Sequence, residues 1–132
     1  MKKTFIQPEN FPAPRGAYSP AVLIETGDTR VLFATGQLAV EADGKVVAPN
    51  EATAQTEFVF KLIGRILDAA GMSFDDIVRT QTYLTDMADF PKFSAVRNRY
   101  LAKAVAASTL LEVKGLAIPG CCVEIEVTAF KG

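Results

Sequence analysis

The sequence contains no histidine among its 132 residues. Imidazole is the usual general acid or base near neutral pH and a common zinc ligand. Its absence excludes Ser/His/Asp and Cys/His catalysis, together with the usual zinc sites. Glutamate, aspartate, tyrosine, lysine and cysteine remain as groups that could transfer protons. We therefore expect any chemistry to proceed without imidazole.

Cysteine is scarce, and the two that occur are neighbours, Cys121 and Cys122. Adjacent residues of a strand point to opposite faces, so the pair indicates no disulfide framework. No basic side chain stands close to them in the sequence to lower a thiol pKa. The pattern predicts two buried, unreactive thiols in a reducing compartment.

An excess of basic charge and a long apolar run are also missing. The 14 Lys and Arg residues are balanced by 15 Asp and Glu residues, and the pI is near 5.4. Without a basic block, binding to a phosphate backbone is not indicated. No apolar stretch approaches the roughly 20 residues of a membrane helix, and the start MKKTFIQPENFP lacks a signal-peptide core. We expect a cytoplasmic protein with neither nucleic acid nor membrane as a partner.

The residues that are present fit one compact domain spanning 1–132. About half of them are apolar, and a chain of this length can bury roughly two thirds of its unfolded surface. Residues 7–20 hold four of the seven prolines, which predicts an ordered loop across the surface. Two β-prone runs, 21–26 and 31–36, flank Gly27 and predict a tight hairpin.

The middle of the chain alternates helix and strand. From residue 51 to residue 70 the apolar side chains fall three or four apart, which predicts an amphipathic helix ended by Gly71. Residues 77–85 alternate with a period of two and are rich in β-branched side chains, which predicts a strand. A second apolar stripe predicts a helix from a cap at Asp89 to about Val105.

Two more apolar runs, 108–113 and 122–130, are predicted to form a closing hairpin. The order strand, strand, helix, strand, helix, strand, strand predicts an α+β fold, with two helices on one face of a mixed or mainly antiparallel sheet. We expect residues such as Ile125 or Leu111 on the other face, which would then need a cover. Self-association is the simplest cover.

Five segments follow one another across nearly the whole chain. They are GAYSPAV (16–22), ATGQLAV (34–40), LDAAGMSFDDIV (67–78), YLTDMADFPKF (83–93) and VEIEVTAF (123–130). In this order and spacing they resemble the Rid family of reactive intermediate deaminases, once named L-PSP endoribonucleases. The resemblance implies a chorismate-mutase-like homotrimer with clefts at the subunit interfaces. It also implies a hydrolase that converts a small enamine or imine to a ketone and ammonia, without a metal or organic cofactor.

By position, the resemblance assigns roles to four residues. Tyr18 corresponds to the aromatic side chain that lines the family cleft, and Thr35 and Gly36 to a small hydroxyl residue and a glycine. Glu124 corresponds to the acid that handles water. We expect Glu124 to orient or deprotonate water, or to protonate departing ammonia, with its pKa tuned by partial burial. Glu126, one strand period away, either shares that environment or is solvated.

The sequence departs from the family at one position. Imine-hydrolysing members carry an arginine that holds the substrate carboxylate in a Pro-Ala-Arg-Ser pattern, and here the stretch VAAST (105–109) places Ala107 there. A charge-assisted hydrogen bond is worth about 1.5 to 3 kcal/mol, so a 2-imino acid should bind more weakly. Arg15, on the Pro-rich loop, and Arg97, on the second helix, are candidate substitutes, and solvated surface arginines are the plain alternative.

Three functions remain open from the sequence. The first is an enzyme that deaminates an enamine or imine, with Glu124 central. The second is a trimer that binds a small molecule without turnover, which the alanine at position 107 favours. The third, a ribonuclease, ranks last because of the acidic pI and the missing histidine. From the residues alone, Glu124 and Glu126 are better explained as the solvent-facing side of a half-exposed strand.

Overall fold

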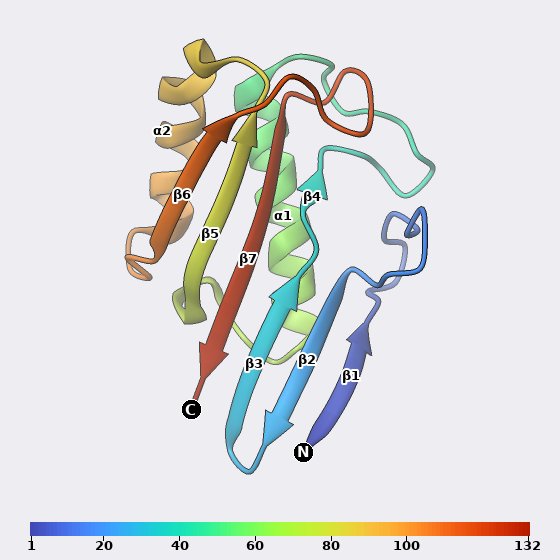
Figure 1. Cartoon of the computed structure of the whole chain (residues 1–132), viewed down its shortest axis with the longest axis vertical. Coiled ribbons are helices and arrows are strands. Elements are labelled where there is room, and N and C mark those ends of the chain that lie inside the picture. The colour runs from blue at the N-terminus through green and yellow to red at the C-terminus, as the bar shows by residue number, and fades with distance from the viewer.

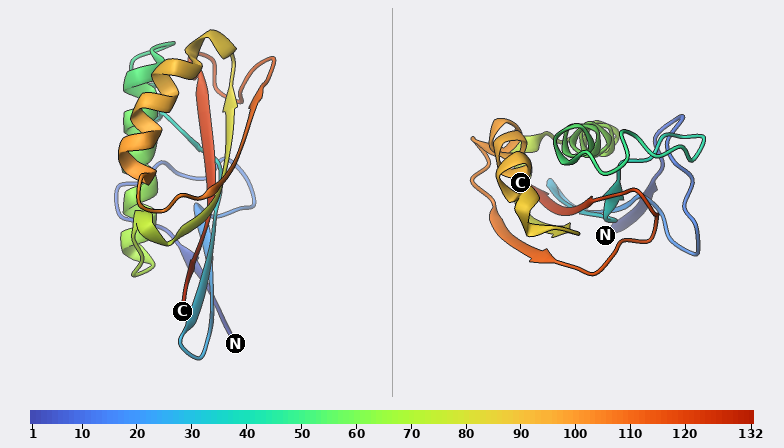
Figure 2. Two further views of the ribbon diagram at one scale, coloured as in Figure 1. Left: turned by 90° about the vertical axis from the view of Figure 1, so that its left-hand side faces the viewer. Right: turned by 90° about the horizontal axis from the view of Figure 1, so that it is seen from above.

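The computed structural model describes residues 1–132 as one mixed sheet with two helices packed on one of its faces (Figures 1 and 2). The strands are β1 (Lys2–Ile6), β2 (Ala21–Thr26), β3 (Thr29–Ala34), β4 (Gln37–Leu38), β5 (Ile77–Leu84), β6 (Ala107–Glu112) and β7 (Val123–Lys131). The helices are α1 (Ala52–Ala69) and α2 (Phe90–Leu101). Two short 3₁₀ turns flank β5: Phe74–Asp76 precedes it, and Met87–Asp89 lies between it and α2. The predicted α+β fold is confirmed.

The predicted hairpin of β2 and β3 is confirmed, although its second strand is Thr29–Ala34 and not 31–36. The two strands pair from Ala21 with Ala34 to Thr26 with Thr29, which leaves a two-residue turn. Gly27 begins that turn with a φ of 59°, a left-handed conformation that glycine adopts without a Cβ clash. The Pro-rich segment 7–20, which we call the arm, is a loop outside the sheet, also as predicted.

The core lies between the sheet and α1. The inward residues of α1, among them Val59, Phe60, Ile63 and Ile66, have no solvent exposure, and the helix ends at Ala69 before Gly71 with a φ of 70°. This stripe and its glycine stop were predicted from the spacing of apolar residues.

The predicted start and end of the second helix are wrong in detail. Asp89 makes no capping hydrogen bond; instead Asp86 accepts a hydrogen bond of 2.9 Å from the backbone of Ala88, because a 3₁₀ turn precedes the helix. The helix ends at Leu101. Val105 adopts a φ of 47°, a left-handed conformation that a β-branched residue adopts rarely and that cannot continue a helix.

The predicted closing hairpin is wrong. The strand order is β1-β2-β3-β7-β5-β6, with β4 also paired to β7. β7 is therefore central and antiparallel to β3 and β5, whereas β6 pairs with β5 in parallel at the edge. The inward residues Val123, Ile125, Val127 and Ala129 are at most 2% exposed. Such a strand gains most in the middle of a sheet, where both neighbours exclude water.

The face of the sheet opposite the helices is open. It exposes large apolar side chains: Phe5 is 65% exposed, Phe33 49%, Leu111 52% and Phe130 47%. Ile125, which we also expected here, is buried on the helix side instead. An apolar band of this kind on a small protein indicates a surface that a partner covers. We call it the open face.

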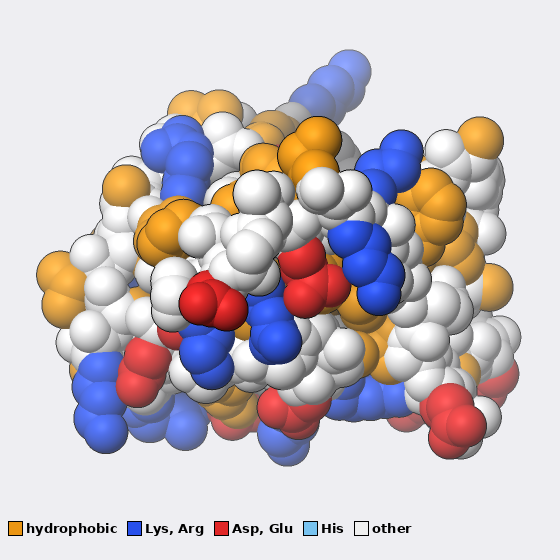
Figure 3. Space-filling model, turned by 90° about the horizontal axis from the view of Figure 1, so that it is seen from below, with side chains coloured by type: hydrophobic (Ala, Val, Ile, Leu, Met, Phe, Trp, Pro, Cys, Tyr) orange, Lys and Arg blue, Asp and Glu red, His pale blue; other side chains and the backbone are white.

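Charges of both signs are interspersed on the side of the molecule seen from below (Figure 3). At the end of the molecule shown in Figure 3, basic and acidic side chains lie among apolar ones, and neither sign forms a continuous field. Neither helix is both long and apolar enough to cross a bilayer.

Candidate functional site

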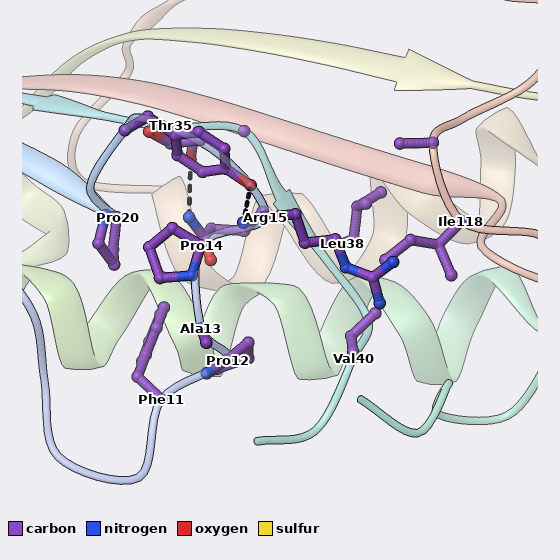
Figure 4. Close-up of a pocket in the computed structure, with 14 residues that line it drawn as sticks. Phe11, Pro12, Ala13, Pro14, Arg15, Pro20, Thr35, Leu38, Val40 and Ile118 are labelled. Carbon is purple, nitrogen blue, oxygen red and sulfur yellow. Dashed lines mark hydrogen bonds between the residues drawn. The ribbon is translucent and has the colours of Figure 1, made fainter. Parts of the chain in front are cut away.

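A cleft of about 160 Å³ lies between the arm and the segment that leads from β3 into β4. Figure 4 shows residues 11 to 15 of the arm along one side, Thr35, Leu38 and Val40 along the other, and Ile118 at the end away from Pro20. The cleft brings together four residues singled out from the sequence: Arg15, Tyr18, Thr35 and Gly36.

The arm is fixed at both ends. Arg65 of α1 donates a hydrogen bond to the carbonyl of Glu9 and lies over the ring of Phe11, 5.2 Å from its centroid. At the other end, the Thr35 hydroxyl donates to the carbonyl of Ser19 at 2.7 Å, and the Thr35 amide donates to Pro20 at 2.9 Å. Thr35 therefore holds the cleft wall in place, a role that its expected position in the cleft did not reveal.

Tyr18 lies on the rim of the cleft. Its hydroxyl accepts a hydrogen bond of 3.0 Å from the backbone amide of Arg15, and its side chain is 51% exposed. The contact keeps the aromatic ring beside Arg15, which is the cation of the cleft lining. The site thus offers an aromatic surface and a positive charge to a small ligand.

Glu124 does not line the cleft itself, but its carboxylate lies against Gly36, which does. It lies on β7 opposite Leu38 of β4 and Tyr83 of β5. A Cβ atom built on Gly36 would lie 2.2 Å from Oε2 of Glu124 and 2.9 Å from its carboxyl carbon. Real atoms do not approach so closely, so glycine is needed at position 36 to let the carboxylate lie against the backbone. This contact explains the glycine.

The two glutamates of β7 have different surroundings. Glu126 accepts a hydrogen bond of 3.1 Å from the Tyr83 hydroxyl and, with the Gln81 amide nitrogen turned toward it, a further one of 3.1 Å. Glu124 has no hydrogen-bond donor within the chain. Burial raises the pKa of Glu124, and the charge of Glu126 raises this pKa further. Glu124 is therefore the carboxylate left free to meet a ligand or water, and its pKa is shifted toward neutrality.

The two cysteines immediately precede β7, the strand that carries Glu124, and are neutral thiols. Both are free and buried, as predicted. Burial raises the pKa of Cys121, and it raises that of Cys122 to about 11. The charge of Arg15 lowers the pKa of the Cys121 thiol and the charge of Glu124 raises it, both by less than burial does. No three Cys, Asp or Glu side chains converge in an arrangement that could hold a metal ion.

Two of the predicted site residues lie elsewhere in the chain. Leu111 is level with Tyr83 and Glu124, and Ala107 is four residues earlier on β6. Four residues of strand and two strand spacings separate the Cα atoms of Ala107 and Glu124 by roughly 16 Å. Arg97 lies at a different hollow, between α2 and β6, where it donates to Asn98 and Ser94. One chain therefore does not unite these two with Glu124.

Sequence reasoning missed Gln55, which is fully buried in α1. Its amide nitrogen donates to the carbonyls of Val47, Ala48 and Gly120 at 2.8 to 3.2 Å, and its oxygen accepts from the amide of Cys122 at 2.8 Å. This one side chain ties two loops to the start of β7 and so positions Glu124. A glutamine four residues before Val59, on the apolar stripe of a helix, was the available clue.

Replacing Gly36 with alanine is expected to push the Glu124 carboxylate away from the cleft, because the new methyl group would occupy the position of Oε2. A displaced Glu124 regains water, so its pKa should fall toward the usual 4.5. Carbon-detected NMR titration of the glutamate carboxyls measures this directly. Gly115→Ala is the matched control, since nothing lies within 4 Å of a Cβ there. An unchanged Glu124 pKa in Gly36→Ala would contradict the contact.

Comparisons with known proteins show the family and agree with the fold. A model of the family described as Endoribonuclease L-PSP matches residues 8–131. The chain is 33% identical to the 3-aminoacrylate deaminase RutC of Acinetobacter baylyi over 98% of each chain. It is 31% identical to a 2-iminobutanoate/2-iminopropanoate deaminase of Rattus norvegicus, over 92% of this chain and 85% of the relative. The crystal structure of YyfA from Yersinia pestis, a Rid family protein of unknown function, is 32% identical with a TM-score of 0.85, over 97% of this chain and 98% of that one.

Proposed function

This chain belongs to the Endoribonuclease L-PSP family, also called the Rid family, and from that membership we propose that it hydrolyses a small enamine or imine to a carbonyl compound and ammonia. Two relatives named as deaminases of such compounds support the reaction class. The observation that carries the proposal is Glu124: a carboxylate without a hydrogen-bond donor in the chain, with a raised pKa, beside a small cleft.

The proposed reaction needs one group that can both take and give a proton. Water adds to the carbon of the C=N bond: Glu124 takes one proton from the water, and the imine nitrogen takes one from solvent. The resulting carbinolamine then loses ammonia: Glu124 returns its proton to the leaving nitrogen, the C–N bond breaks, and the hydroxyl proton passes to solvent as the C=O bond forms. An enamine enters this sequence after protonation at carbon. A carboxyl with a pKa raised toward neutrality suits both steps, and the addition of water is redox-neutral, so we propose no cofactor.

The cleft sets the size of the proposed substrate. A volume of about 160 Å³ is below the roughly 300 to 1,000 Å³ of a site for a drug-sized ligand, which suits a metabolite of a few heavy atoms. We propose that the ring of Tyr18 lies against the flat unsaturated group and that Arg15 attracts negative charge. The proposed compartment is the cytoplasm, since both thiols are unpaired.

We propose that three copies assemble with their open faces inward. The exposed Phe33 and Phe130 would then be covered, which the isolated chain does not do. In a closed ring the face of each copy lies against the next, so the Ala107 end of one sheet can approach the Glu124 cleft of its neighbour. The separation of these two positions within one chain favours a site built from two copies.

Ala107 also favours a rival function, a trimer of the same shape that binds its ligand without turnover. The methyl side chain at this position offers no charge to a substrate carboxylate. The rival and the enzyme differ in one observable, the release of ammonia.

The test generates 2-aminoacrylate in place with a pyridoxal-dependent dehydratase and follows ammonia and pyruvate with and without the protein. An uncharged enamine is tested in parallel. Acceleration of either reaction, in protein that sediments as a trimer, supports the proposal. Binding of these compounds' products without any acceleration supports the rival, and a monomer at micromolar concentration contradicts the assembly.

A further inference from the structure

The open face carries one group of polar residues within its apolar surroundings. In successive rows across the sheet, Arg79 of β5 is level with Ala107 of β6, Gln81 with Thr109, and Tyr83 with Leu111. On the other side of β5, Gln81 is level with Glu126 and Tyr83 with Glu124. Of these, Arg79 is the cation, and it lies outside the cleft that holds Arg15.

Arg79 has no carboxylate partner. Its guanidinium donates to the Thr109 hydroxyl at 3.2 Å, and the ion pairs of the chain lie elsewhere, between Arg30 and Glu25 and between Arg99 and Glu57. The nearest acid on the face, Glu126, is engaged by Tyr83. The positive charge is therefore available to an outside anion.

The space beside Arg79 is open. Its register partner on β6 is Ala107, with a single methyl group, so no side chain from that position covers the arginine stem. The contact with Thr109 turns the guanidinium along the sheet, toward the row of Gln81 and Glu126. A planar guanidinium with one edge on a hydroxyl keeps its other donors free for a carboxylate.

If a second copy covers the open face, burying the charge of Arg79 costs free energy. An unpaired guanidinium removed from water loses solvation unless an anion replaces it. Within one chain, Glu124 cannot supply that anion, because its carboxylate lies against Gly36, beside the edge of β7 that faces away from β5. Arg79 and Glu124 can instead meet across the contact between two copies, since the same face bears both residues.

We infer that Arg79 of one copy binds the anionic group, a carboxylate or its equivalent, of a ligand held at Glu124 of the neighbouring copy. This inference rests on the proposed function for its assembly and its site. It assigns the ligand class as a small anion with an unsaturated nitrogen group, anchored at one end by Arg79 and Thr109 and attacked by water at the other. Arg15 then borders the cleft without being the main anchor.

The first experiment compares Arg79→Met with Lys103→Met, which removes a basic charge from the exposed chain beyond α2. For anionic 2-aminoacrylate, Arg79→Met is expected to raise KM by about 10- to 150-fold, the loss of one charge-assisted contact. KM for an uncharged enamine should stay within about threefold. Arg79→Lys should be intermediate, because it keeps the charge and loses the bidentate geometry.

A second measurement does not depend on turnover. Pyruvate, the carbonyl product of 2-aminoacrylate, is titrated into wild type, Arg79→Met and Arg15→Met and followed by NMR. Binding lost in Arg79→Met and kept in Arg15→Met supports the inference even if the protein hydrolyses nothing, in which case the proposed function alone fails. Equal binding in wild type and Arg79→Met overturns it, as does dissociation of the Arg79→Met trimer in sedimentation, which would show an ion pair between subunits instead.

Mixing the two variant subunits, with 2-aminoacrylate well below the KM of Arg79→Met, tests the two-copy site. Arg79→Met and Glu124→Gln proteins are unfolded together and refolded at equal amounts. If each site takes Arg79 from one copy and Glu124 from the next, about one quarter of the sites in random trimers are intact, and activity on 2-aminoacrylate should return to about that fraction of wild type. No recovery in the mixed trimers overturns the inference.

Discussion

Glu124→Gln is expected to reduce the turnover of an enamine or imine by about 10²- to 10⁴-fold, the range for loss of a general acid or base. The amide keeps the shape of the side chain but can neither take a proton from water nor return one to ammonia. Glu124 is the carboxylate at the cleft without a hydrogen-bond partner in the chain, so no neighbour replaces it. The measurement is kcat for ammonia release at saturating substrate.

The same substitution is expected to make the protein more stable at neutral pH. In the folded protein the pKa of Glu124 is raised above the usual 4.5, so the folded state binds the proton more tightly than the unfolded chain. The free energy of unfolding therefore falls as the pH rises from the pKa of the unfolded state to the pKa of the folded state. Above the folded-state pKa the loss is complete. Glutamine removes this loss. The Tm of Glu124→Gln should match that of wild type near pH 4 and exceed it at pH 7.

Glu126→Gln is the matched control on the same strand and face. It removes the neighbouring charge that raises the Glu124 pKa, so the acid limb of the rate profile should move to lower pH, while turnover at pH 7 stays within an order of magnitude. Turnover lost equally in both variants, or a Glu124→Gln protein that is less stable at pH 7, would show that Glu124 is a structural residue.

Gln55→Met is expected to lower the free energy of unfolding by about 3 to 5 kcal/mol. Methionine fills a similar volume but makes none of the hydrogen bonds that join Gln55 to Val47, Ala48, Gly120 and Cys122. Each buried backbone group left without a partner costs about 1 to 3 kcal/mol, less what relaxation and water recover. Against a typical total of 5 to 15 kcal/mol this is a large loss.

Urea unfolding followed by circular dichroism measures the effect. Gln7→Met, the same chemical change at an exposed position of the arm, should change stability by less than about 0.5 kcal/mol. A loss below about 1 kcal/mol in Gln55→Met would mean that the loops reach the start of β7 without this side chain. The positioning of Glu124 would then have another origin.

Local patterns were enough to predict much of the fold. The stripe of α1, its stop at Gly71, the hairpin around Gly27 and the proline-rich arm each depend on residues close together in sequence. The order of strands depends on distant partners, and for that reason the pairing of the last strand was predicted wrongly. Val78 shows a smaller failure of the same kind: a register shift between Ile77 and Arg79 leaves it 46% exposed, where simple alternation places it with the buried Thr80.

The candidate site was predictable in part. The resemblance to a family named Glu124 and the cleft residues, and the structure adds the reason for Gly36, which is a distance that no sequence contains. Arg79 was overlooked because an arginine on the exposed side of a strand is ordinary; only the register shows that it stands beside Ala107. The role of Gln55 depends on three loop carbonyls that the chain brings together from far apart.

The central position of β7 also affects how the chain folds while it is being synthesised. Among the strands of the sheet it is the last to be synthesised, yet it joins β3 to β5. While the ribosome is still adding it, both of those strands have an unpaired edge, and such edges invite pairing with other nascent chains. A translational pause just before residue 123 should therefore send more of the protein into inclusion bodies than a pause near the start of the chain.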